Sequence, residues 1–255
     1  MTALVPPFLY PLMLYSSLLT MAVLLFGLNR SLKLANWPAV DRTLTVWTAA
    51  ILLALFYVAA ALPSRQGFYH GPAGNIPTIQ YGLLGPILAA ILLFRFWPAF
   101  RRTVTAVPQQ WLIGLQLFRI EGAIFLILYA MHRLPPQFAL PAGIGDVLVG
   151  LAAPFVAIAY LRKGAQANGL ILAWNLLGLL DLVTAVITGV LSSPIPIHVF
   201  TLDAPNELIS LYPLVMVPVF LVPLAILLHL ASLQKLRRTE PVQKDQHAVL
   251  ADRRA

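Results

Sequence analysis

The chain has 255 residues, of which 60% are hydrophobic and only 10% are Asp, Glu, Lys or Arg. About a quarter of the residues in an average soluble domain are charged, so this chain lacks the charge to cover a water-facing surface of its size. It contains no cysteine, which excludes disulfides, thiol nucleophiles and cysteine-ligated metals. The mean hydropathy of +0.83 and these counts exclude a soluble enzyme, a disordered chain and a disulfide-rich secreted scaffold.

Seven long apolar runs follow one another along the chain. Crossing a hydrocarbon core about 30 Å thick takes roughly 20 apolar residues in a helix. The runs lie near residues 7–27, 44–62, 79–97, 109–131, 141–161, 168–191 and 207–232. We therefore expect an all-α polytopic integral membrane protein, a bundle of seven transmembrane helices over residues 1–232. Residues 233–255 are polar and basic, and we expect them to form a flexible cytoplasmic tail.

The basic residues alternate between the two sides of this predicted bundle, and cytoplasmic loops carry an excess of Lys and Arg. Thirteen of the 17 basic residues fall in the loops after the first, third and fifth runs or in the tail. The opposite loops hold only Arg65 and Arg133. This pattern predicts an outer N-terminus, a cytoplasmic C-terminus and a location in the cell membrane. It also explains the net charge of +8 by attraction to anionic lipids, without a nucleic-acid partner.

Five polar side chains fall at bilayer depth and are the candidate site: Arg119, Glu121, Asp146, Asp181 and Asn175. A charged group at that depth is costly unless it faces protein or water, so it is a functional candidate by default. Asp146 shares a helical face with several glycines and alanines, and Asp181 shares one with Gly178 and two threonines, so both faces should point into the bundle.

Arg119 and Glu121 are two positions apart and cannot pair within one helix, because partners lie three or four residues apart. We therefore expect Arg119 to pair with Asp146 or Asp181, and Glu121 to find a partner on another helix. Three carboxylates then share one guanidinium. At least one acid is expected to carry a proton near neutral pH, which is what a proton relay requires.

A second set of polar residues lies at the predicted outer surface. It comprises His70, His132, His198, Asp203 and Glu207. Such a set could hold a metal, but no pair has the H-x-x-x-H spacing that would make a site specific, so no metal and no cofactor are expected. Retinal is excluded because the last run has no lysine for a Schiff base.

Three functions remain from the sequence. The leading one is a small transporter or permease, proton-linked, in which Asp146 and Asp181 bind a proton or substrate and Arg119 is their counter-ion. The second is a non-catalytic membrane subunit or sensor whose intramembrane charges are structural. The third is a membrane-embedded enzyme with a His and acid site on the outer face. Transport predicts a cavity that reaches Asp146 and Asp181, whereas the subunit predicts a dry, fully paired bundle.

Overall fold

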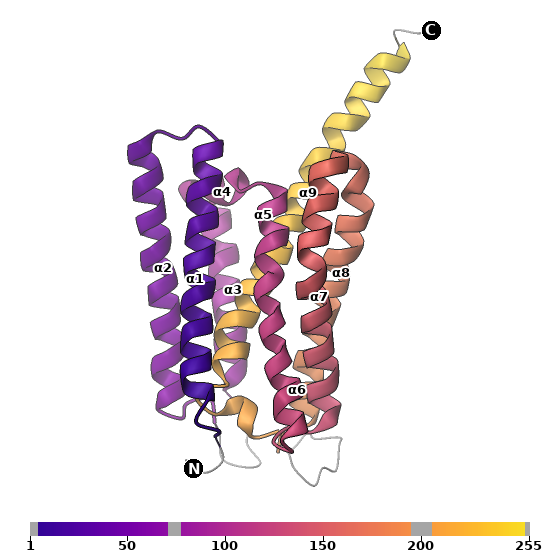
Figure 1. Cartoon of the computed structure of the whole chain (residues 1–255). Coiled ribbons are helices and arrows are strands. Elements are labelled where there is room, and N and C mark those ends of the chain that lie inside the picture. Colours follow the sequence, from indigo (N-terminus) through magenta and orange to yellow (C-terminus); the bar gives the residue numbers. More distant parts are fainter. Residues whose placement is uncertain (1–4, 71–77, 195–205, 253–255) are drawn as a thin grey trace.

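The computed structural model describes residues 5–70, 78–194 and 206–252, with side chains through Arg237. These residues are helical, and six stretches are long and apolar enough to cross a membrane by length and composition. One of the six, Pro136–Leu191, contains two helices that turn back on each other (Figure 1). Only helices and closed barrels satisfy their backbone groups in lipid, so this is the architecture of a multi-pass helical membrane protein.

The first three helices are α1 (Leu9–Leu34), α2 (Ala39–Arg65) and α3 (Ile79–Phe96). They lie together on one side of the bundle, and α2 is its most exposed member (Figure 1). An apolar helix can be exposed in this way when the surrounding solvent is lipid rather than water.

A short helix, α4 (Pro98–Ala106), lies across one end of the bundle, at a position where only a basic loop was predicted (Figure 1). Proline is favoured at the first helical position because its missing N–H would have no partner there. The helix has no buried residue, and its Arg102 guanidinium carbon lies 4.5 Å from the centroid of the Trp37 ring. An exposed helix with arginine and aromatic side chains suits a membrane–water interface.

The fourth crossing is not a uniform α-helix. It consists of α5 (Gln109–Gly114), a 3₁₀ segment η1 (Leu115–Gly122) and α6 (Ala123–Ala130). Because a 3₁₀ helix has three residues per turn, side chains three apart lie directly above one another. Gln116 and Arg119 are therefore aligned on one buried face.

The next two helices form a hairpin, α7 (Pro136–Lys163) and α8 (Asn168–Leu191), joined by the 3₁₀ turn η2 (Gly164–Ala167). The buried face of α7 carries small residues around Asp146, including Gly143 and Gly150, as their helical spacing predicts. Small side chains let neighbouring backbones approach closely, which brings the flanking helices within reach of Asp146.

The last crossing starts irregularly. The sequence placed its start at residue 207, but the segment that follows forms the 3₁₀ turn η3 (Leu208–Ser210) and further turns before the helix begins. A π-helical segment η4 (Val217–Leu221) then leads into α9 (Val222–Asp252), which extends beyond the bundle (Figure 1). Prolines 213, 218 and 223 supply no N–H to the helix ladder, which accounts for the late and irregular start.

Two apolar clusters make up the core of the described residues, one towards each end of the bundle. On α7, Ala142 belongs to the first cluster and Val149 to the second. Asp146 therefore lies at the junction between the two clusters, where the polar side chains meet.

Candidate functional site

Arg119 is the centre of the site. Its Nε donates to Asp146 Oδ1 at 2.8 Å, and its Nη2 donates to Asp181 Oδ2. Its Nη1 donates to the Gly178 carbonyl oxygen at 3.2 Å and to His229 Nε2 at 3.0 Å. Four of the five N–H groups of the guanidinium are thus used, and they connect η1, α7, α8 and α9.

The two ion pairs are removed from water. The exposed fraction is 1% for the Arg119 side chain, 10% for Asp146 and 13% for Asp181. The predicted pairing of Arg119 with one of these acids is confirmed, and both acids contact it. One guanidinium therefore pairs with two carboxylates. When both carboxylates are ionised, the cluster carries one negative charge that no basic side chain balances.

Glycines make this close approach possible. A Cβ at Gly178 would overlap the His229 imidazole and lie 3.1 Å from Arg119 Nη1. A Cβ at Gly122 would lie 2.8 Å from Asp146 Oδ2. Larger residues at these positions would push the charged side chains apart, so the glycines set the distance between the helices at the site.

His229 extends the cluster into a hydrogen-bonded chain. Arginine has no acceptor, so His229 Nε2 must accept from Arg119, and the ring proton must be on Nδ1. Nδ1 then donates to Asn175 Oδ1 at 2.9 Å, while Asn175 Nδ2 donates to Ser232 Oγ at 2.8 Å. Gln109 Nε2 also donates to Ser232 Oγ, at 2.6 Å. The hydrogen bonds require a neutral imidazole with a defined tautomer.

Glu121 lies apart from this chain. Its Oε1 accepts from Thr20 Oγ1 of α1 at 3.4 Å, which supplies the partner on another helix that the sequence predicted. Its Oε2 is buried and makes no hydrogen bond within the described part of the chain. Ser17 of α1 also has a buried hydroxyl without a partner there. Glu121 is thus a second, less satisfied polar position between η1 and α1.

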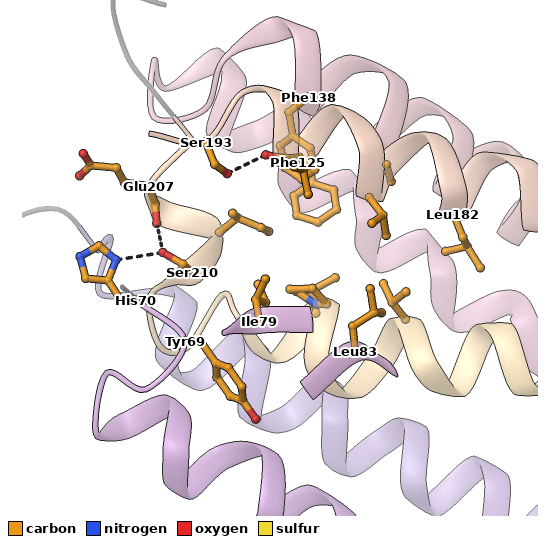
Figure 2. Close-up of a pocket in the computed structure, with 18 of the residues that line it drawn as sticks. Tyr69, His70, Ile79, Leu83, Phe125, Phe138, Leu182, Ser193, Glu207 and Ser210 are labelled. Carbon is orange, nitrogen blue, oxygen red and sulfur yellow. Dashed lines mark hydrogen bonds between the residues drawn. The ribbon is translucent and has the colours of Figure 1, made fainter. Parts of the chain in front are cut away.

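A cavity of about 120 Å³ reaches the site from the end of the bundle that carries Tyr69, His70 and Ser210 (Figure 2). Asp146 lines it, and Asp181 does not. Most of its walls are apolar: Figure 2 shows Phe125 and Phe138 facing Ile79 and Leu83. The cavity predicted for transport is therefore present at one of the two acids.

Polar groups gather where the cavity meets the end of the bundle. His70 Nδ1 lies 2.9 Å from Ser210 Oγ, and Ser210 donates to the Glu207 carbonyl oxygen at 2.8 Å (Figure 2). Since the Ser210 hydroxyl donates its hydrogen to the Glu207 carbonyl oxygen, His70 Nδ1 must be the donor to Ser210 Oγ. Tyr69 lines the cavity beside them, and burial raises the pKa of its phenol, which therefore stays neutral.

The outer histidines are only partly placed by the structure. His70 and Glu207 line the cavity, His132 is exposed, and His198 and Asp203 lie outside the described residues. Within the described residues, no three His, Asp or Glu side chains are grouped as a metal site would need.

The central cluster consists of Arg119, Asp146, Asp181, Asn175 and His229. The sequence predicted four of these residues as site candidates and missed His229. Arg119, Asp146, Asp181 and Asn175 come together, whereas Glu121 faces α1. The signal for His229 was present in the spacing of the last run. Four buried residues recur there at intervals of four, three and four, on one helical face: Ala225, His229, Ser232 and Leu236.

The fold and this polar cluster indicate the class: a helical multi-pass membrane protein with a buried ion-pair site. Residues 76–237 match the model of a family described as a domain of unknown function (DUF8737), and the chain belongs to this family. The match covers every residue of the central cluster but not α1 and α2. No curated protein and no solved structure matches the chain.

Proposed function

We propose that the protein is a small proton-linked permease, in which Asp146 and Asp181 take up and release a proton or a cationic substrate and Arg119 holds them in place. The observation that carries this proposal is that Asp146 faces both the Arg119 guanidinium and a cavity from one end of the bundle. A solute can reach a carboxylate in that position through the cavity, while the guanidinium holds it from the other side.

The charge count supports uptake of a positive charge. Two carboxylates share one guanidinium, and the neighbouring His229 is neutral in the arrangement that the hydrogen bonds require. An unpaired buried anion is costly, so a proton or a bound cation lowers the energy of the site. Binding and release of that positive charge is the elementary step of a proton-linked carrier.

Polar side chains continue from the site towards the other end of the bundle. Beyond His229 come Asn175, Ser232 and Gln109, which connect α8, α9 and the start of α5. The site is thus bordered by a cavity on one side and by a buried polar column on the other. That arrangement supports access from alternating sides of the membrane.

The irregular helix segments support movement at this point. Arg119 and Gln116 belong to the 3₁₀ segment η1, and the π-helical segment η4 lies next to the cavity through Val217 and Pro218. Such segments have weaker or shifted backbone hydrogen bonds and often mark hinges or functional positions in helices. Broken helices near the bilayer midplane are also typical of transporter sites.

The test is flux in liposomes that contain the purified protein and a pH-sensitive dye. Solutes of several classes are added outside: amines, amino acids, carboxylates and sugars. We expect at least one class to change the internal pH, and both Asp146→Asn and Asp181→Asn to abolish the change. Asp41→Asn is the matched control, because Asp41 is exposed in the first turn of α2.

An internal pH that no solute class changes would refute the permease proposal. So would a change that persists in both intramembrane variants. Retained flux in Asp181→Asn alone would restrict the proton-binding role to Asp146, the acid that lines the cavity.

A second candidate function is a non-catalytic membrane subunit or sensor, and the four hydrogen bonds of Arg119 favour it. Four hydrogen bonds from one side chain connect four helical elements, which is what a purely structural cluster would do. Under this alternative, the Asn variants lower thermal stability in detergent and no solute produces flux in the wild-type protein.

The proposal includes seven crossings, an outer N-terminus, a cytoplasmic C-terminus and location in the cell membrane. It is supported by the α7–α8 hairpin within one apolar stretch, and by α1 starting and α9 ending at opposite ends of the bundle (Figure 1). The alternating basic loops support the orientation. Lipid headgroups are then the partners of exposed basic residues such as Arg101 and Arg102.

A further inference from the structure

We propose that the cavity binds a small apolar amine, a molecule with one ring-sized hydrocarbon body and one ammonium group that contacts Asp146. This inference deepens the proposed permease and rests on it, because it names the class of solute that the carrier would take.

The walls of the cavity select the body of the ligand. Aromatic and aliphatic side chains from α3, α6, α7, α8 and η4 line it, and Phe125 and Phe138 contact each other with ring centroids 5.1 Å apart. A cavity of about 150 Å³ with apolar walls can hold benzene. At about 120 Å³ this cavity is close to that size and suits a single small ring rather than a sugar or a peptide.

The inner end of the cavity selects the charge of the ligand. Asp146 Oδ1 accepts from Arg119, but no hydrogen bond reaches Oδ2 from the described residues. The residue is 7% exposed and lines the cavity, so a ligand in the cavity can reach this carboxylate. An ammonium group would supply the missing donor and the missing positive charge together, whereas an anion would add to an existing excess of negative charge.

The nearby basic group does not reverse this preference. Arg119 already donates to two carboxylates, a carbonyl and an imidazole, so it has one N–H left for a ligand. At the far end of the cavity, His70 donates to Ser210, and the Glu207 carboxyl points away from the cavity (Figure 2). The charges around the cavity therefore favour a cation at the end where Asp146 lies.

The test compares three ligands that share one ring: benzylamine, benzyl alcohol and benzoate. Binding to the full-length protein in detergent is measured by calorimetry. A buried charge-assisted hydrogen bond should make benzylamine bind about tenfold tighter than benzyl alcohol or better, with benzoate the weakest. Equal affinity for the amine and the alcohol, or tightest binding of benzoate, would overturn the proposal.

Two variants separate the charge from the space. Asp146→Asn should remove the preference for the amine over the alcohol while both still bind. Ala185→Leu, which adds bulk to the cavity wall on α8, should weaken all three ligands and leave Asp146 unchanged. Asp41→Asn should keep the wild-type order. A persistent amine preference in Asp146→Asn would overturn the role of this carboxylate, and Ala185→Leu keeps the cavity testable if Asp146→Asn does not fold.

The liposome assay distinguishes failure of this inference from failure of the permease proposal. If benzylamine binds as expected but no solute changes the internal pH, the ligand class stands and the permease proposal fails. If another class of solute moves protons and benzylamine does not bind, the permease proposal stands and the ligand class fails.

Discussion

Replacing Arg119 by glutamine tests whether the central cluster is held by charge. The substitution keeps a polar side chain but removes the one cation that two buried carboxylates share. Removing one partner of a buried ion pair costs about 3–5 kcal/mol, because an uncompensated charge remains in the interior. For a chain of this size, 1 kcal/mol shifts the melting temperature by about 2–4 °C, so we expect a fall of about 6–20 °C.

The measurement is thermal unfolding of the purified protein in detergent at neutral pH. Arg133→Gln is the matched control, since it makes the same chemical change at an exposed position and should shift the melting temperature by less than about 2 °C. If Arg119→Gln lowers the melting temperature by less than about 2 °C, as the control does, the reasoning is refuted.

A triple variant separates charge from shape. With Arg119→Gln, Asp146→Asn and Asp181→Asn combined, no charge is left in the cluster, and amides can still hydrogen-bond to one another. Neutral replacements of a buried ion pair are often tolerated, so we expect the triple variant to recover most of the lost stability. If it is no more stable than Arg119→Gln alone, the hydrogen-bond geometry of the guanidinium, rather than its charge, holds the helices together.

Three further predictions concern neighbouring features. Nitrogen-15 NMR of labelled protein should show His229 neutral and protonated on Nδ1, and His229→Phe should cost about 1–3 kcal/mol by leaving Arg119 and Asn175 groups unpaired. A proton on Nε2 would contradict the assignment. Gly178→Ala should cost about 1–3 kcal/mol, measured by thermal unfolding, because its methyl group would overlap the imidazole. Because the chain has no native cysteine, Arg133→Cys should react with an impermeant maleimide from outside cells and Lys163→Cys only after lysis, and the opposite result would reverse the proposed orientation.

The sequence alone determined the class of protein and the position of most helices. A helix that crosses lipid must present a long run of apolar residues. Such runs are visible in the sequence without any knowledge of the tertiary contacts. The small-residue spacing around Asp146 also predicted which side of α7 is buried, because a helical period relates sequence distance to direction. The two partners of Arg119 followed from depth, charge and spacing, since the third acid at this depth, Glu121, is two positions from Arg119 and cannot pair with it within one helix.

The tertiary structure decided what the sequence could not. The 3₁₀ segment that aligns Gln116 with Arg119 contains no proline that would have signalled a change from α-helix, so the sequence did not predict it. His229 reaches the site because α9 passes close to α8 at Gly178, a contact between positions 51 residues apart in the chain. The cavity likewise forms between seven elements: α3, α6, α7, α8, η3, η4 and α9. Its walls combine faces of helices that are far apart in the sequence, so no reading of single runs could have located it.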